Sequence, residues 1–354
     1  MARQWTLARQ DGFEASLEFK ENVPVPAPNE LGRNKVLVKI KAASLNFRDL
    51  QIPKGAAHGP INIPLIPGCD GAGVVEAVGL DVQEFVPGDR VVMYAAPELA
   101  ETRGDDAQAT LADTPHMLGH GSPGTLTTIG VFSEKALVHA PKSLDWLPAG
   151  SLSCNWPTAW NALFGLKNKE AGPGTWVLVQ GTGGLGVAIL QVAVAAGATV
   201  VATTSTEDKA ARLRGLGASR TVNYRTSADT WGTEARALTP GGRGFDIVID
   251  VGGDETLGES LKAIRPEGVL YVLGRVGGDA EPVSLFGCLM ATCMVRGVLY
   301  GSRNQFKEVV RFIDEKGIMP AGDDIVFELA DAKNAYKRLS EKKHFAKVLI
   351  KVIE

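Results

Sequence analysis

The clearest hydrophobic pattern in the chain is an apolar run followed by a glycine-rich turn and a second, longer apolar run. Residues 175–180 are predicted to form a buried strand, followed by a glycine turn and a helix that opens at Leu185 and is apolar on almost every face over residues 187–196. Gly197 ends this helix before another apolar strand at residues 199–203. This order predicts the first unit of a parallel sheet.

Four more strand patterns follow, with helical stretches between them. They cover residues 221–224, 245–251, 269–273 and 295–300. Regular alternation of strands and helices is typical of a doubly wound parallel sheet. We therefore predict an α/β domain in this part of the chain.

Before the glycine turn, the pattern changes to short strands separated by Pro and Gly. These strands are expected at residues 3–8, 17–20, 36–43, 71–78 and 90–94. Residues 97–128 combine Glu, Asp, Gly and Pro, so a long, mobile polar loop is expected there, with His116 and His120 in solvent. The end of the chain is predicted to return to this β-rich part through a helix at 305–315, a strand at 325–328, a helix at 330–340 and a strand at 347–353.

The glycines of the turn have the spacing G-x-G-x-x-G. Gly181 permits the tight turn, Gly183 lets the backbone approach a pyrophosphate, and Gly186 lets the helix pack closely on the strand. The helix N-terminus then presents N–H groups to the anion. We predict that a dinucleotide binds here, in contact with Gly181, Thr182, Gly183, Gly184, Leu185 and Gly186.

Composition favours small-molecule chemistry. The chain has 354 residues, enough for two domains, and its formal net charge of −3 gives no reason to expect a nucleic-acid or membrane partner. The first residues lack a signal-peptide pattern, so a cytoplasmic protein is expected. Four widely spaced cysteines without a C-x-x-C motif indicate reduced thiols.

Three further segments, together with the glycine turn, carry a resemblance to a known family. They are residues 45–50 (LNFRDL), residues 63–79 (IPLIPGCDGAGVVEAVG) and residues 86–91 (VPGDRV). Their order over nearly the whole chain resembles the medium-chain dehydrogenase/reductase superfamily. The resemblance implies a GroES-like β-rich catalytic domain with an inserted Rossmann domain, a doubly wound parallel sheet. We place the first at residues 1–147 and 302–354 and the second at 148–301.

The superfamily contains zinc alcohol dehydrogenases and zinc-free reductases. A catalytic zinc needs three protein ligands of Cys, His or acidic type. Where the zinc enzymes carry a Cys, this sequence has Asn46; where they carry Gly-His-Glu, it has Gly-Cys-Asp at 68–70; only Cys154 stands where a ligand Cys would. Residues 94–126, the place of a structural zinc, contain no cysteine. The resemblance implies the zinc-free branch, that of quinone and enoyl reductases, without a metal.

The end of the second strand of the α/β domain bears on the cofactor. An acidic residue there would bind the ribose hydroxyls of NAD. The chain instead has Thr204 and Ser205, whose hydroxyls can donate to a 2′-phosphate, and Lys209 adds positive charge. The resemblance places Tyr224 beside that phosphate. We therefore predict NADP, although residues 207–209 also fit an ordinary first helical turn, which leaves NAD open.

The resemblance implies further contacts. The backbone near Gly274 and the side chain of Thr158 are expected to flank the nicotinamide, and Gly252 follows a strand at the edge where open α/β sheets bind ligands. The apolar stretch 284–298 matches an edge through which relatives pair two subunits, so a homodimer is plausible. A buried internal strand explains the same pattern.

Hydride transfer leaves negative charge on the acceptor oxygen, and hydrogen-bond donors must stabilise it. The candidates are the Asn46 amide, Arg48 and Tyr94. Arg48 has an alternative role in a structural ion pair with Asp49. Asp70 is interpreted as part of a polar turn.

The sequence thus predicts a zinc-independent, NADPH-dependent oxidoreductase that transfers hydride to a small conjugated carbonyl compound or a quinone. One alternative is a zinc-dependent alcohol or carbonyl dehydrogenase whose metal is held by Cys69 and Cys154. Another is a non-catalytic NADPH-binding sensor or partner subunit of a synthase.

Overall fold

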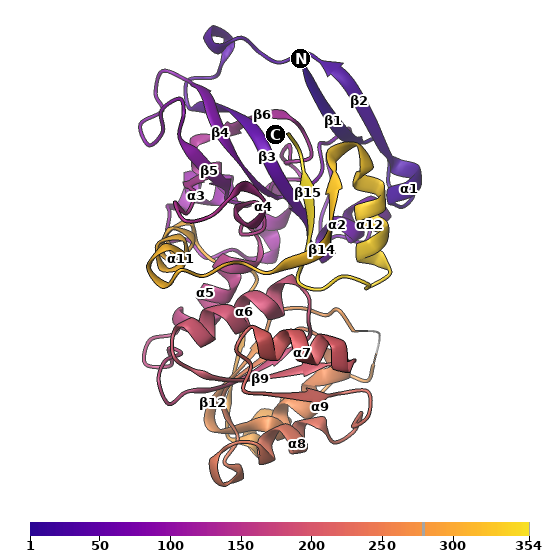
Figure 1. Cartoon of the computed structure of the whole chain (residues 1–354), viewed down its shortest axis with the longest axis vertical. Helices are drawn as coiled ribbons and strands as arrows, with labels where there is room; N and C mark the ends of the chain where they lie inside the picture. Colours follow the sequence, from indigo (N-terminus) through magenta and orange to yellow (C-terminus); the bar gives the residue numbers. More distant parts are fainter. Residues whose placement is uncertain (278–279, 354) are drawn as a thin grey trace. The chain divides into compact units, whose positions relative to one another are not determined.

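The computed structural model describes residues 1–277 and 280–353, and it divides into two compact units (Figure 1). The first unit comprises Met1–Pro157 and Tyr300–Glu354, and the second comprises Thr158–Leu299. The divisions thus follow residues 157 and 299, where residues 147 and 301 were predicted. The segment around Gly150 stays with the first unit because Ser44 Oγ lies 3.0 Å from the Gly150 carbonyl oxygen.

The second unit is built on a six-stranded parallel sheet. Its strands are β8 (Trp176–Gln180), β9 (Thr199–Thr204), β10 (Arg220–Asn223), β11 (Phe245–Asp250), β12 (Ile264–Val272) and β13 (Met294–Gly297). The spatial order β10-β9-β8-β11-β12-β13 starts at the centre and winds outward in both directions. The predicted doubly wound Rossmann sheet is confirmed.

Helices connect these strands and cover the sheet (Figure 1). They are α6 (Gly184–Ala195), α7 (Glu207–Gly215), α8 (Trp231–Ala237), η5 (Pro240–Gly242), α9 (Asp254–Ala263) and α10 (Phe286–Ala291). Trp231 and Phe245 pack in a buried cluster with Leu178, Val248 and Leu270. Full burial of each such side chain stabilises the fold by about 1.5–3 kcal/mol.

The first unit contains a seven-stranded sheet in the order β14-β15-β3-β4-β5-β7, with β6 paired to β3. The strands are β3 (Lys35–Leu45), β4 (Asp70–Val78), β5 (Arg90–Met93), β6 (Ile129–Ser133), β7 (Leu137–His139), β14 (Gly322–Glu328) and β15 (Lys347–Lys351), and a separate pair is β1 (Ala2–Leu7) with β2 (Leu17–Val23). The C-terminal strand β15 lies inside the sheet, between β14 and β3. The β-rich GroES-like prediction is confirmed for this unit.

The helices of the first unit are mostly short, and the last residues of α5 belong to the second unit. They are α1 (Phe13–Ser16), η1 (Pro28–Glu30), α2 (Phe47–Gln51), η2 (Ile52–Lys54), α3 (Pro97–Arg103), η3 (Leu111–His116), η4 (Glu134–Ala136), α4 (Trp146–Ala149), α5 (Asn155–Phe164), α11 (Arg303–Lys316), η6 (Leu329–Asp331) and α12 (Ala332–Ser340). The strands β6 and β7 were not predicted, because each is short and only η4 separates them.

Residues 97–128 do not form one long polar loop, as was predicted. The helix α3 buries Leu99 and Ala100. Arg303, which is completely buried, donates to Asp105 Oδ2 at 2.6 Å and to Glu84 Oε2 at 2.9 Å. The acidic residues that suggested a solvated loop therefore include an anchor to α11.

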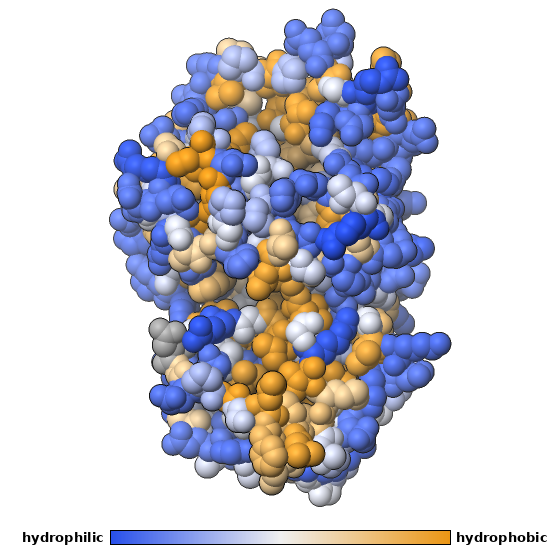
Figure 2. Space-filling view, turned by 180° about the vertical axis from the view of Figure 1, so that it is seen from behind, coloured by the Kyte–Doolittle hydropathy of each residue, from blue (hydrophilic) through white to orange (hydrophobic). Residues whose placement is uncertain are grey.

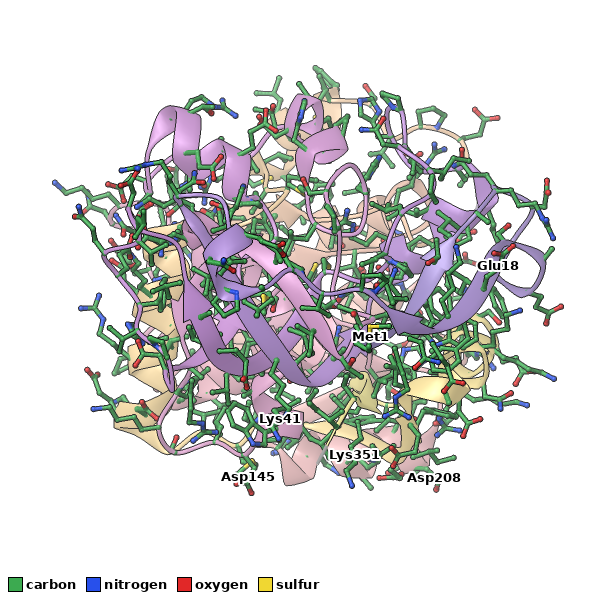
Figure 3. All side chains as sticks on the ribbon, turned by 90° about the horizontal axis from the view of Figure 1, so that it is seen from above. Met1, Glu18, Lys41, Asp145, Asp208 and Lys351 are labelled. Carbon is green, nitrogen blue, oxygen red and sulfur yellow. The ribbon has the colours of Figure 1, made fainter. Side chains whose placement is uncertain are left out.

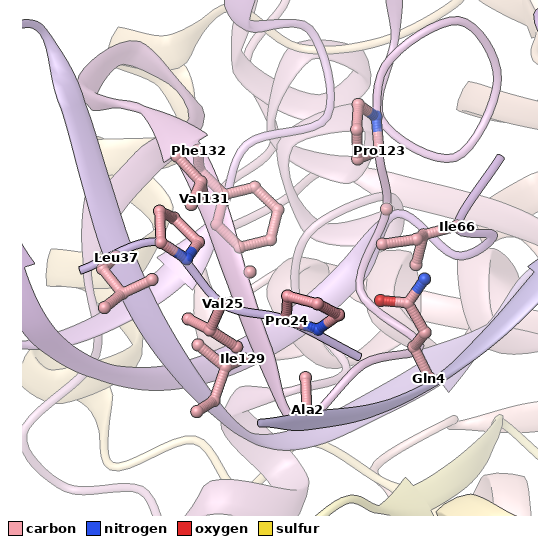
Figure 4. Close-up of a pocket in the computed structure, with 13 residues that line it drawn as sticks. Ala2, Gln4, Pro24, Val25, Leu37, Ile66, Pro123, Ile129, Val131 and Phe132 are labelled. Carbon is pink, nitrogen blue, oxygen red and sulfur yellow. The ribbon is translucent and has the colours of Figure 1, made fainter. Parts of the chain in front are cut away.

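Charged side chains such as Glu18, Asp145 and Lys351 point outward (Figure 3). In the described ranges, no helix is long and apolar enough to cross a membrane. A hollow of about 190 Å³ beside β6 is lined mainly by apolar side chains, including Leu37 and Phe132 (Figure 4). None of the predicted site residues lines it.

Candidate active site

The strands β15, β3 and β4 lie side by side, and their adjoining ends form a polar centre in the first unit. The register places Leu45 of β3 opposite Val348 of β15, and Ser44 opposite Asp70 at the start of β4. Asn46 follows β3 directly and is the N-cap residue of α2. Pairing of the strands therefore brings side chains from three distant parts of the sequence together.

Lys347, the first residue of β15, holds this centre together. Its Nζ donates to the Leu45 carbonyl at 2.7 Å, to Asn46 Oδ1 at 2.6 Å and to Asp70 Oδ2 at 2.8 Å. Lys347 is 3% exposed and Asp70 is 0% exposed. We call Lys347, Asp70 and Asn46 the lysine centre. The prediction that Asp70 belongs to a polar turn is wrong, because it begins a strand and is ion-paired in the interior.

Two thiols adjoin the lysine centre. Cys69 Sγ lies 3.5 Å from Asp70 Oδ1 and 3.6 Å from Asn46 Nδ2, and the Cys154 N–H donates to Asp70 Oδ1 at 3.0 Å. A hydrogen bond to Cys154 and burial raise the pKa of Cys69 well above its ordinary value. None of the four cysteines forms a disulfide. Cys69 is therefore a neutral thiol at neutral pH.

The two charged residues that follow Asn46 have different environments. The Asp49 carboxylate accepts the Asn46 backbone N–H at 2.7 Å, and burial raises the pKa of Asp49 to about 6. Among the described residues, no ion pair joins Arg48 to Asp49, so the structural ion pair considered from the sequence is not found. Arg48 Nη2 is buried without a hydrogen-bond partner, within electrostatic reach of Cys69 and Cys154. Arg48 thus remains a candidate donor.

Tyr94 does not have the position expected of a catalytic donor. Its side chain is 0% exposed, and its O–H donates to the Gly301 carbonyl at 3.3 Å. Its ring packs against Tyr300 with centroids 5.4 Å apart, and burial raises the pKa of Tyr94. The prediction is corrected: the phenolic proton is used inside the first unit.

The two histidines predicted to lie in solvent differ from each other. His116 Nδ1 lies 2.9 Å from Glu98 Oε2 at the surface, as an exposed residue would. His120 is only 2% exposed, and its Nε2 is buried without a partner. Burial and the nearby charge of Arg48 lower the pKa of His120 to about 4. The prediction is therefore wrong for His120, which is a buried, neutral imidazole.

In the second unit, the three glycines of the turn have distinct local geometries. Gly181 has a φ of 78°, which a residue with a side chain rarely adopts. At Gly183, an added Cβ would find no atom within 4 Å, so the backbone faces open space. At Gly186, an added Cβ would lie 2.6 Å from the Gln180 carbonyl oxygen, because the helix packs directly on the strand. These residues fit a dinucleotide, and α6 begins at Gly184 with its N–H groups facing the turn.

A buried polar network lies directly before this turn. Gln180 Nε2 donates to Asp250 Oδ2 at 2.9 Å and to Ser260 Oγ at 2.8 Å, and Ser260 Oγ also donates to Asp250 Oδ2 at 2.7 Å. The Thr256 hydroxyl donates to the same carboxylate at 2.9 Å. We call Gln180, Asp250, Thr256 and Ser260 the glutamine centre. It joins the carboxyl ends of β8 and β11, and it was not predicted from the sequence.

The predicted nicotinamide contacts have the following positions. Gly252 and Gly274 follow the neighbouring strands β11 and β12, at the same carboxyl edge as the glycine turn. The Gly252 N–H donates to Gln180 Oε1 at 3.4 Å. Thr158 is a buried residue of α5.

The predicted phosphate-binding residues are only partly suited to that role. Thr204 is 2% exposed, and its hydroxyl donates to the Thr206 carbonyl at 3.4 Å, so its predicted hydroxyl contact with a phosphate is wrong for this conformation. Ser205 and Lys209 are partly exposed, and Tyr224 is 40% exposed. The Tyr224 N–H donates to the Thr204 carbonyl at 3.1 Å, which keeps the ends of β9 and β10 together.

Family models match both units of the chain. The alcohol dehydrogenase GroES-like domain matches residues 32–146, and the zinc-binding dehydrogenase family matches residues 184–315. The zinc-type alcohol dehydrogenase-like protein C1773.06c of Schizosaccharomyces pombe is 38% identical over 329 residues, which cover 92% of this chain and 93% of that protein. The chain belongs to the medium-chain dehydrogenase/reductase superfamily.

Other members of the superfamily resemble the chain over most of its length. A 2-haloacrylate reductase from Burkholderia sp. is 32% identical over 80% of this chain and 75% of its own length. A crystal structure of an NAD-dependent alcohol dehydrogenase covers 99% of this chain and 100% of its own, with a TM-score of 0.85 and 31% identity. As a superfamily member, the protein is an oxidoreductase of a family that binds a nicotinamide cofactor.

The family name raises the question of zinc, and the residues around Asp70 can be tested for it. Ligand atoms of Cys69, Asp70 and Cys154 lie within 4.8 Å of one another. A catalytic zinc requires three protein ligands, and here the only carboxylate of the three is already paired with the Lys347 ammonium. Arg48 adds a second positive charge beside the thiols. This donor set does not fit a catalytic zinc.

Proposed function

We propose that this superfamily member is a zinc-independent, NADPH-dependent reductase that transfers hydride to a small conjugated carbonyl compound or a quinone. The observation that carries the proposal is the Lys347–Asp70 ion pair, which neutralises the carboxylate that lies within 4.8 Å of both thiols. The same centre fixes an amide that can donate hydrogen bonds. The similarity to a protein named 2-haloacrylate reductase supports a conjugated acceptor.

The roles of the residues follow from their chemistry. A bound nicotinamide cofactor supplies the hydride. Residues 181–186 and the N-terminus of α6 hold its pyrophosphate. In the first unit, Asn46 Nδ2 donates to the acceptor oxygen as negative charge develops, and Arg48 adds positive charge. Removal of one such donor is expected to lower kcat by about 10- to 100-fold. Water delivers the proton.

Metal content and turnover, measured together, test this function. Purified protein is treated with a chelator, its zinc is quantified, and NADPH oxidation is followed with a panel of enones, quinones and aldehydes. We expect turnover with an enone or a quinone, and we expect the chelator to leave its rate unchanged. If no acceptor in the panel oxidises NADPH, the proposal is contradicted.

A zinc-dependent alcohol dehydrogenase is the second candidate. The proximity of Cys69, Asp70 and Cys154, within 4.8 Å, is the observation that favours it. One zinc per chain, with alcohol oxidation that a chelator abolishes, would support this candidate and overturn the first.

The preference for NADPH rests on the ends of β9 and β10. Ser205, Lys209 and Tyr224 are accessible there, and no acidic side chain stands at residues 203–206. Lys209→Ala is expected to weaken NADPH binding about tenfold, which corresponds to loss of one charged hydrogen bond, and to change NADH binding much less. Lys262→Ala, on α9, is the control. Equal losses for both cofactors would favour NAD, which the name of the similar NAD-dependent alcohol dehydrogenase also suggests.

We propose that the protein assembles as a homodimer through β13. This strand is at the edge of its sheet, and next to it α10 exposes Phe286, Leu289 and Met290 at 63%, 65% and 73%. Figure 2 shows a broad apolar area on the surface of the second unit. Exposed patches of this kind mark interaction sites. Phe286→Glu is expected to halve the mass measured by light scattering, whereas Leu80→Glu, in the first unit, leaves it unchanged.

A further inference from the structure

Lys347 has no free hydrogen-bonding capacity. An ammonium group carries three donors, and here they reach the Leu45 carbonyl, Asn46 Oδ1 and Asp70 Oδ2 at 2.6–2.8 Å. The side chain is 4% exposed. A lysine in this condition cannot contact a substrate, so any role in the reaction must act through the groups that it holds.

The most informative of these groups is the side chain of Asn46. An Asn at an N-cap position normally accepts a backbone N–H of the helix with its side-chain oxygen. Asn46 makes no such bond, because its Oδ1 accepts the Lys347 ammonium instead. The side chain of Asp49 caps this helix instead, because it accepts the Asn46 backbone N–H at 2.7 Å. The chain therefore forgoes a common stabilising contact in favour of one orientation of the amide.

This orientation has a direct chemical consequence. With Oδ1 bound to an ammonium, the amide cannot flip, since a flip would direct Nδ2 hydrogens at a positive charge. Nδ2 must face the opposite side, where Cys69 Sγ lies 3.6 Å away and takes at most one of its two hydrogens. An amide whose oxygen binds a cation is also a stronger donor, because linked hydrogen bonds polarise one another.

We propose that Lys347 is a positioning residue: paired with Asp70, it locks and polarises the Asn46 amide so that Nδ2 donates to the oxygen of the hydride acceptor. The lysine centre thereby places a positive charge beside the thiols of Cys69 and Cys154. The donor set of these thiols and Asp70 does not fit a metal. This role rests on the proposed reductase function.

A double-mutant cycle between Lys347 and Asn46 tests the proposal. We expect K347M and N46A each to lower kcat about 10- to 100-fold, with little change in the KM for NADPH. In the N46A background, K347M should lower kcat by less than twofold further. K351M, on the same strand but facing outward (Figure 3), should have the kcat of the unaltered protein. Independent, multiplicative effects of K347M and N46A would overturn the proposal.

Loss of folding must be separated from loss of positioning. K347M leaves Asp70 as an unpaired buried charge, whereas D70N/K347M removes both charges. We expect the double variant to regain thermal stability but not kcat. A recovery of kcat together with stability would show that Lys347 has only a structural role.

A readout without turnover separates failure of this proposal from failure of the proposed function. The side-chain amide signal of Asn46 in nitrogen-15 NMR, identified by its loss in N46A, reports the orientation of the amide. We expect this signal to move in D70N/K347M and to stay in place in K351M, even if no acceptor is reduced. An unmoved signal in D70N/K347M would overturn the positioning role on its own.

Discussion

The two units each bury an aspartate completely, and they stabilise its negative charge in different ways. In the lysine centre, Asp70 accepts the Lys347 ammonium at 2.8 Å. In the glutamine centre, the donors to Asp250 from the described residues are all neutral, among them Gln180 Nε2 at 2.9 Å and Ser260 Oγ at 2.7 Å. Both carboxylates have zero exposed surface.

This difference separates two uses of a buried charge. Several neutral donors share the charge of Asp250 and hold the end of β8 just before Gly181, so the glutamine centre supports the shape of the glycine turn. Asp70 is paired with one ammonium, which also binds Asn46, in addition to the neutral donors Ser44 Oγ at 2.9 Å and the Cys154 N–H at 3.0 Å. The lysine centre therefore polarises the Asn46 amide as well as fixing its orientation. It should also be more sensitive to loss of a single side chain.

The largest expected effect is on folding of the first unit. Lys347→Met leaves the carboxylate of Asp70 buried and unpaired, and loss of one partner of a buried pair destabilises a protein by about 3–5 kcal/mol. Urea unfolding measures this change. Lys351→Met, at the half-buried other end of the same strand, should change the unfolding free energy by about 1 kcal/mol or less. Equal stability of the two variants would show that Lys347 does not stabilise the charge of Asp70.

The next effect is pH-dependent and concerns His120, a buried imidazole whose Nε2 has no hydrogen-bond partner. The pKa of His120 is lowered to about 4, mainly by burial. The unfolded chain, with an ordinary value of about 6.5, therefore takes up a proton between pH 6.5 and 4 that the folded chain does not. Stability from this group is full above pH 6.5 and falls by about 3 kcal/mol as the pH drops to 4.

The measurement for His120 is the difference in unfolding free energy between the unaltered protein and His120→Gln across this pH range. Asp49, whose pKa burial raises to about 6, titrates in both proteins and cancels in the difference. A difference that does not vary with pH would mean that His120 is protonated, or solvated, in the folded state.

The smallest effect concerns the glutamine centre. Ser260→Ala removes one of several neutral donors to Asp250 and should lower the unfolding free energy by about 1–2 kcal/mol. Ser340→Ala, at an exposed position of α12, is the matched control and should change it by about 0.5 kcal/mol or less. A loss as large as that of Lys347→Met would remove the distinction between the two centres.

Much of the second unit could be predicted because its signals are local. The apolar run before Gly181, the spacing of the three glycines and the repeated strands all depend on neighbouring residues, and the sheet matches them. The short strands β6 and β7 were missed because only the single turn η4 separates them, so no stretch there is long enough to show a periodic pattern with clear ends. Residues 97–128 were misjudged because the buried partner of Asp105 is Arg303, which lies far along the chain.

The lysine centre could not be predicted for the same reason. Lys347 and Asn46 are 301 residues apart in sequence and meet only because β15 pairs with β3. A lysine at the start of an apolar strand is otherwise typical of a solvent-facing strand end. The one available signal was Asp70, an acid placed directly before an apolar strand, and its burial depends on that same pairing. Tyr94 and Thr204 were overestimated because sequence does not show which hydroxyls are used internally.

The most direct test of zinc-independent hydride transfer is kcat for NADPH and a small enone, measured on a sample whose zinc content is determined at the same time. We expect full turnover with far less than one zinc per chain, and a loss of about tenfold or more in D70N/K347M, which should remain folded. Turnover that rises in proportion to bound zinc would contradict it.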